Sequence, residues 1–154
     1  MIFYGKQSID RSDINSVISS LKSGFVTQGP KVKQFEKALC KKFGSKYSCV
    51  VSNGTAGLHL VGLSLSWKKS DIVLCSPISF LAASNAVLYC GATPKFVDID
   101  KETFNIDIEK LKKKIEKINL NNKKIVAIIA TDFAGNPCNW QKLSVLSKKY
   151  KIKL

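Results

Sequence analysis

The feature that most constrains how this chain can fold is a regular alternation of short apolar runs with segments of helical length. The helical segments repeat their apolar residues at a period of about 3.6, and the central apolar runs carry almost no charge. This alternation indicates an α/β fold with a mostly parallel sheet and helices on both faces. The strand-like runs are residues 47–51, 71–76, 93–99, 124–131 and 151–154.

The first 45 residues differ from the remainder and are expected to form a separate helical segment. Pro30 suits a first helical turn, and Gly44 suits a helix end. We therefore divide the chain into residues 1–45, a helical segment, and residues 46–154, a partial α/β domain. The apolar stripe of the second helix, which we expect to be buried, consists of Val32, Phe35, Leu39 and Phe43.

Residues 50–60, VVSNGTAGLHL, place four small or polar residues between an apolar run and an uncharged helical segment. The first N–H groups of a helix have no partner within the helix, and they carry the positive end of its dipole. Gly54 lets an anion approach the backbone closely, and Thr55 adds a hydroxyl donor. The stretch predicts a cup for one phosphate group at the carboxyl edge of the sheet, although a plain turn at Asn53 and Gly54 explains it equally well.

Two better-known phosphate-binding motifs are absent from the sequence. It contains neither GxxxxGK[ST], typical of nucleoside-triphosphate loops, nor GxGxxG, typical of dinucleotide-binding folds. The predicted phosphate cup therefore belongs neither to a nucleoside-triphosphate loop nor to a dinucleotide-binding motif.

The net charge of +14 raises the question of nucleic-acid binding. Only Arg11 among the 25 basic residues is an arginine, whereas base readout and bidentate phosphate contacts favour arginine. The lysines are spread along the chain, and the densest group, at 110–117, falls on the polar face of one helix. Solvated helix faces explain the charge better than a nucleic-acid partner does.

The five cysteines form no CxxC pair and no cluster with histidine, so we expect no disulfide and no metal site. Cys49 and Cys75 lie within apolar runs, where a thiol behaves as a small hydrophobic group. No apolar run is long enough to span a bilayer, and residues 1–10 do not resemble a signal peptide. These observations favour a reducing cytoplasm and no membrane partner.

Four stretches, in this order, resemble the N-terminal part of the DegT/StrS-type sugar aminotransferases, which are pyridoxal-phosphate (PLP) enzymes of the aspartate-aminotransferase fold. The third is the most specific, because order, spacing and residue types all agree. The stretches are GFVTQGPKVKQFEKAL at 24–39, VVSNGTAGLHL at 50–60, SPISFLAASNAVLYCGATPKFVDID at 76–100 and TFNIDIEKL at 103–111.

Three shorter segments resemble one branch of this family, the enzymes that aminate C4 of a UDP-linked 4-keto-6-deoxy-HexNAc on the route to pseudaminic acid. They are FYGKQSID, TQGP and DFAGNPCNW. The resemblance implies an amino group transferred from a donor, expected to be glutamate, to a nucleotide-linked keto sugar. It also implies a homodimer.

The resemblance assigns the cofactor contacts to the cup and to one aromatic residue. Gly54, Thr55 and Ala56 match the positions that hold the PLP phosphate, and Phe80 matches the residue that stacks on the pyridine ring. An aromatic residue just past a strand's carboxyl end suits a flat ring. From the residues alone, a core phenylalanine at a helix start is the simpler explanation of Phe80.

The resemblance also assigns substrate contacts. Positions matching the family's sugar-nucleotide contacts are Tyr4 and the turn Val26, Thr27, Gln28 and Gly29, although a plain turn before Pro30 explains the latter as well. Asp132 follows a strand and is either a substrate contact or a loop cap. His59 lies within an apolar helix and is expected to be semi-buried and not a ligand.

Two catalytic groups of the family, the Schiff-base lysine and the aspartate that protonates the pyridine nitrogen, have no counterpart in this chain. In the family both follow the position equivalent to Leu154. We therefore expect the chain to be the N-terminal part of a longer protein and to be inactive alone. The alternative is a non-catalytic binding or regulatory module that keeps the fold without the lysine, and a basic nucleic-acid-binding domain is a weaker third hypothesis.

Overall fold

The computed structural model describes residues 5–120 and 124–154. The chain divides into two compact units, Met1–Val50 and Val51–Leu154. Among the described residues, none of the helices has the length and apolar character that crossing a membrane requires. All five cysteines are free.

The first unit consists of two helices, α1 (Arg11–Leu21) and α2 (Pro30–Phe43). Asp10 caps α1, because its carboxylate accepts the N–H groups of Ser12 and Asp13 at 2.7 and 3.2 Å. The second helix begins at Pro30 and ends at Gly44, whose φ of +64° is readily adopted by glycine. Both boundaries of α2 confirm the sequence prediction.

The expected burial of the α2 stripe is wrong for this chain. Val32, Phe35 and Phe43 are 39%, 54% and 70% exposed. Two short helices do not have enough surface to enclose the apolar faces of both. The helical period thus predicts an apolar stripe that no layer among the described residues of this unit covers.

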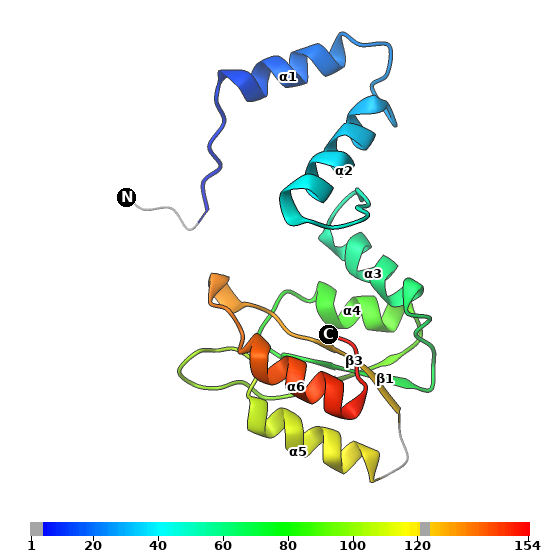
Figure 1. The fold of residues 1–154 in the computed structure, drawn as a ribbon, viewed down its shortest axis with the longest axis vertical. Coiled ribbons are helices and arrows are strands. Elements are labelled where there is room, and N and C mark those ends of the chain that lie inside the picture. Colours follow the sequence, from blue (N-terminus) through cyan, green and yellow to red (C-terminus); the bar gives the residue numbers. More distant parts are fainter. Residues whose placement is uncertain (1–4, 121–123) are drawn as a thin grey trace. The chain divides into compact units, whose positions relative to one another are not determined.

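The second unit is built on a parallel sheet in the order β2-β1-β3. Figure 1 labels its strands β1 and β3. Its strands alternate with helices along the chain, as the sequence predicts, which confirms the partial α/β fold. The elements are α3 (Gly54–Ser64), β1 (Asp71–Cys75), α4 (Ala82–Tyr89), β2 (Thr93–Phe96), α5 (Ile108–Asn119), β3 (Lys124–Ile129), the short 3-10 helix η1 (Phe133–Gly135) and α6 (Trp140–Tyr150).

The central strand β1 is buried along its whole length and supplies both faces of the core. Ile72 and Leu74 belong to the larger apolar cluster, which also contains Leu111 of α5 and Leu143 of α6. Val73 and Cys75 belong to the opposite cluster, which includes residues of α4. Alternate side chains of one strand therefore face two helical layers. Burial raises the pKa of the Cys75 thiol to about 12.

Two strand predictions have different outcomes. Residues 47–51 form no strand, because no described segment pairs with them, and the N–H of Val50 donates to the Glu36 carboxylate at 3.1 Å. Cys49 in this run is exposed and not a core residue. At the other end, Lys153 forms a parallel bridge with Ala127, and its carbonyl accepts the N–H of Ile128 at 2.8 Å, so the last run does begin to pair with β3.

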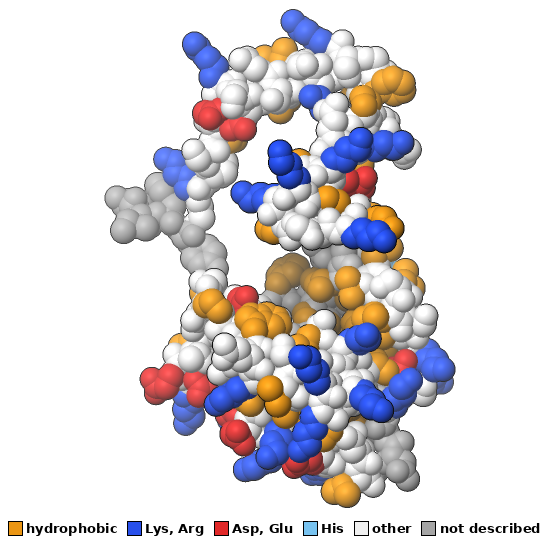
Figure 2. All heavy atoms as spheres, viewed as in Figure 1, with side chains coloured by type: hydrophobic (Ala, Val, Ile, Leu, Met, Phe, Trp, Pro, Cys, Tyr) orange, Lys and Arg blue, Asp and Glu red, His pale blue; other side chains and the backbone are white. Residues whose placement is uncertain are grey.

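In α5 the apolar face is buried and the basic residues lie toward the surface, as expected. In α5, Leu111 and Ile115 are fully buried, whereas Lys110 is exposed and forms an ion pair with Asp98 at 2.8 Å. Figure 2 shows basic side chains scattered over the visible face of the second unit, with acidic and apolar side chains between them.

Helix α3 comes unusually close to its neighbours at Gly62. A Cβ at this position would lie 2.6 Å from Cε3 of Trp67 and 2.7 Å from Sγ of Cys90. Both neighbours are held in the packed region between α3 and α4 and cannot move freely. By contrast, a Cβ at Gly57 would be 3.5 Å from Val51, an ordinary contact.

We expect the substitution Gly62→Ala to lower the free energy of unfolding by about 1–3 kcal/mol, because the added methyl overpacks a filled interior. The matched variant Gly57→Ala, in the same helix, should leave stability unchanged or raise it by up to about 1 kcal/mol through better helix propensity. Urea unfolding of both variants measures the difference. Equal effects at the two positions would contradict the close approach at Gly62.

Candidate functional site

The candidate site comprises the start of α3 and the segments that follow β1 and β3. Helix α3 leads through residues 65–70 into the amino end of β1. In a doubly wound α/β fold a helix in this position is expected to start at the carboxyl edge of the sheet. The segments after β1 and β3 begin at the same edge, where open α/β sheets bind ligands.

The start of α3 has two N–H groups without a protein acceptor. Within the described residues, the N–H groups of Gly54 and Thr55 donate to no protein atom, whereas the N–H of Ala56 donates to Oδ1 of Asn53 at 2.9 Å. A Cβ at Gly54 would meet nothing within 4 Å. The position is therefore open to an approaching anion, and two of the three predicted amides are free to bind it.

The third amide of the predicted cup, the N–H of Ala56, already has a hydrogen-bond acceptor in the side chain of Asn53. Asn53 is the N-cap of α3, and its side chain is exposed. An anion that bound all three amides would have to displace the Asn53 oxygen from Ala56. This exchange replaces one hydrogen bond by another and is therefore inexpensive.

Phe80 is not a core residue. Its side chain is 79% exposed, and it lies in the loop between β1 and α4, four residues after the buried Ser76. Burial therefore does not explain an aromatic side chain at this position. The residue remains the predicted stacking partner of a flat ring.

Asp132 acts as a loop cap. Its Oδ1 accepts the N–H of Cys138 at 2.8 Å and the indole N–H of Trp140 at 3.1 Å. The bond from the Cys138 backbone is the main reason why the pKa of Asp132 lies below its usual range. Burial and the neighbouring Asp132 raise the pKa of the Cys138 thiol to about 11. Both capping bonds use Oδ1, so Oδ2 takes no part in them.

The predicted substrate turn lies in the first unit. Val26, Thr27 and Gln28 are exposed, and Gln28 has a left-handed φ of +50°. Gly29 is required by packing, because a Cβ there would be 2.7 Å from the Phe25 Cβ. The turn is thus tightly built and presents its side chains outward. Tyr4, the other predicted contact, lies outside the described residues.

His59 is partly buried in α3, as the sequence predicts. Its ring packs edge-on against Tyr89 of α4, with 5.5 Å between the ring centroids. This packing contact accounts for the residue without a ligand.

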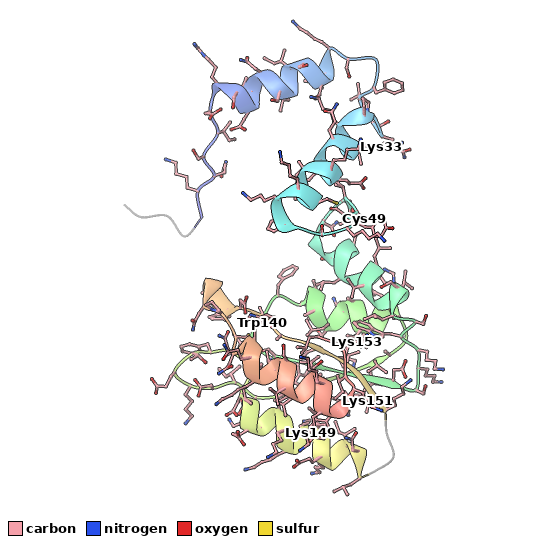
Figure 3. All side chains as sticks on the ribbon, in the orientation of Figure 1. Lys33, Cys49, Trp140, Lys149, Lys151 and Lys153 are labelled. Carbon is pink, nitrogen blue, oxygen red and sulfur yellow. The ribbon has the colours of Figure 1, made fainter. Side chains whose placement is uncertain are left out.

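Sequence reasoning missed two residues that hold the loop after β3. Trp140, which is labelled in Figure 3, donates its indole N–H to the Asp132 carboxylate from the first turn of α6. Asn105 is buried and bonds the same loop through both atoms of its amide. The only available signal was its place within TFNIDIEKL, since nothing in the local pattern predicts a bond across nearly 30 residues.

This geometry defines a partial parallel α/β domain with two unpartnered amides at the start of α3, an exposed aromatic residue after β1 and a capped loop after β3. The chain matches the DegT/DnrJ/EryC1/StrS aminotransferase family over residues 7–154. It belongs to this family, which confirms the resemblance found in the sequence.

Among curated relatives, the chain is 43% identical over its whole length to the UDP-4-amino-4,6-dideoxy-N-acetyl-beta-L-altrosamine transaminase of Campylobacter jejuni subsp. jejuni serotype O:23/36, and it covers 40% of that protein. The solved structure of Helicobacter pylori PseC, an aminotransferase involved in the biosynthesis of pseudoaminic acid, matches with a TM-score of 0.81 and 31% identity over 97% of this chain and 39% of PseC.

A third match is a GDP-4-keto-6-deoxymannose-3-dehydratase solved with a trapped PLP-glutamate geminal diamine. Its TM-score is 0.86 and its identity 31%, over 97% of this chain and 39% of that one. The chain therefore spans about 40% of the length of the relatives it matches.

The capped state of Asp132 predicts a pH dependence of stability. Because the folded-state pKa is lowered, the charged carboxylate stabilises the fold above the pKa of the unfolded chain, and this contribution is lost as the pH falls through the folded-state pKa. We expect the parent chain to be more stable than the Asp132→Asn variant at pH 7 and equally stable at about pH 2. Urea unfolding across this range measures the difference, and a constant difference would contradict the charge-assisted cap.

Proposed function

We propose that the chain forms the cofactor-phosphate and ring-stacking part of a PLP-dependent aminotransferase that acts on a UDP-linked 4-keto-6-deoxy sugar. The observation that carries this proposal is the pair of unpartnered amides at Gly54 and Thr55, at the start of a helix that leads into β1. The family membership and the names of the relatives support it.

The residues at the edge fit PLP in three respects. Two free amides and the Thr55 hydroxyl suit a phosphate, the open space beside Gly54 admits it, and Phe80 offers an exposed ring face. Ala56 would join the phosphate contacts if Asn53 released its N–H. When bound, PLP supplies the electron sink for moving an amino group, and these residues would hold and orient it.

The remaining assignments follow from the family and belong to the same proposal. Residues 1–45 supply the substrate-facing turn at Val26, Thr27, Gln28 and Gly29, and residues 46–154 supply the cofactor part. Tyr4 and Asp132 are further sugar-nucleotide contacts, and the amino donor is glutamate. The complete protein is a cytoplasmic homodimer, and its Schiff-base lysine comes from sequence beyond the region that this chain covers.

The cup is tested with inorganic phosphate and PLP as separate probes of the 154-residue chain. We expect the substitution Gly54→Val to abolish binding of both, because its side chain fills the approach to the two free amides. The fold should be retained, since a Cβ there meets no protein atom. Gly24→Val adds the same side chain at another open glycine and serves as the control. Isothermal titration calorimetry measures the affinities, and unchanged binding by Gly54→Val would remove the cup assignment.

Substitution of Phe80 tests the stacking of the PLP ring separately from the binding of its phosphate. We expect Phe80→Leu to weaken PLP binding by about 0.5–1.5 kcal/mol, a few-fold to tenfold, and to leave inorganic phosphate binding unchanged. Stability should also be unchanged, because the side chain is 79% exposed. Equal losses for both probes in the same titrations would contradict a stacking role.

The whole-protein activity is tested on a protein that carries this chain at the length of its relatives. Incubation with PLP, glutamate and a UDP-linked 4-keto-6-deoxy-HexNAc should give the 4-amino sugar, detectable by mass spectrometry. Loss of water from the sugar without amination would instead indicate a dehydratase like the third relative. PLP binding without either reaction, in a protein lacking the lysine, would indicate the regulatory module.

A further inference from the structure

A buried amide joins the two loops that follow β2 and β3. Asn105 is 5% exposed, and both atoms of its amide bond the backbone of the second loop. Its Nδ2 donates to the carbonyl of Asn136 at 3.0 Å, and its Oδ1 accepts the N–H of Phe133 at 3.0 Å. These bonds hold the loop on both sides of η1.

Neighbouring residues strengthen the same junction. Nδ2 of Asn136 donates to the carbonyl of Thr103 at 3.3 Å, and the rings of Phe104 and Phe133 lie 6.0 Å apart. The two loops leave strands that flank β1 on either side, so they begin at the same carboxyl edge of the sheet. Asn105 therefore fixes one loop of this edge against another.

The loop that Asn105 holds contains Asp132. Phe133, whose N–H bonds Asn105, follows Asp132 directly, and Ala134 within η1 has a left-handed φ of +51°. A short irregular loop with such a conformation depends on its side-chain bonds. The position of the Asp132 carboxylate is thus set by its own bonds to Cys138 and Trp140 and by the anchor at the next residue.

We propose that Asn105 is a positioning residue that places the Asp132 carboxylate for contact with the substrate at the sheet edge. The inference rests on the proposed function, because it takes Asp132 as a substrate contact. Only a short amide fits this position: aspartate lacks the donor for Asn136, leucine lacks both groups, and glutamine is one methylene longer.

The first test uses the 154-residue chain and does not depend on catalysis. The indole N–H of Trp140 donates to Asp132, so its NMR signal reports the titration of that carboxylate. Trp67, the other tryptophan, is 7% exposed and has no hydrogen-bond partner on its indole nitrogen, so its signal serves as the internal reference. Asn105→Ala should move the titration midpoint of Asp132 upward, toward that of a free aspartate, because the loop no longer holds the Cys138 N–H against it.

Three matched variants make this result specific. Asn105→Ser replaces the alanine variant if the latter does not fold, since a serine is too short to form both bonds. Asn136→Ala removes the bond to Thr103 but keeps both Asn105 bonds, which use the Asn136 backbone, and it should shift the midpoint much less. Ile115→Ala opens a cavity in the core without removing any hydrogen bond of the loop and should leave the midpoint unchanged. A folded Asn105 variant with the parent midpoint, or an equal shift in Ile115→Ala, would overturn the proposal.

The second test uses the protein at the length of its relatives. Loss of Asn105 should lower kcat/KM for the keto sugar by about tenfold to a hundredfold, as small misplacements of positioning groups do, and should leave the affinity for PLP unchanged. A moved midpoint with unchanged kcat/KM would overturn the positioning role. Failure of the proposed function is seen separately, since it would appear as loss of PLP binding or amination by the parent protein itself.

Discussion

The structure of the second unit depends on the parallel pairing of β1 with β2 on one side and β3 on the other. Because β1 is buried on both faces, its alternating side chains fix where α4 packs and where α5 and α6 pack. Parallel pairing also sends every strand in the same direction, so the connections after all three strands begin at one edge. The candidate site is a consequence of this arrangement, since each of its segments either follows one of these strands or begins a helix that leads into one.

In the candidate site, some polar groups that secondary structure leaves unpaired are satisfied by the protein, and others have no protein partner among the described residues. Asn53 satisfies one N–H at the start of α3 and leaves two, whereas Asp132 and Asn105 satisfy the backbone of the loop after β3. The cup is therefore open, and the loop is closed upon itself. An open cup with a fixed neighbouring loop is suited to a site in which one partner, the phosphate, is held by the backbone and the other is oriented by side chains.

The sequence predicted those elements whose cause is local and failed where the cause lies elsewhere in the chain. The alternation of short apolar runs with helical segments predicted the sheet. Pro30 and Gly44 marked the ends of α2, because capping acts within a few residues. Residues 47–51 have strand composition but no pairing partner among the described residues, so the predicted strand is absent. No described layer covers the α2 stripe, so its predicted burial failed. For Asp132 the sequence left two roles open, and the bonds from Cys138 and Trp140 establish the capping role.

The capping role of Asp132 does not exclude a substrate role. Both capping bonds converge on Oδ1, and a carboxylate has a second oxygen with its own lone pairs. A side chain anchored through one oxygen loses its rotamer freedom within the folded chain, so a ligand that bonds the other oxygen need not immobilise it again. The same bonds keep the group ionised, since they lower its pKa. An anchored and charged acceptor at a sheet edge is suited to hydroxyl or ammonium groups, and in the proposed substrate role the loop cap would make Asp132 an effective contact.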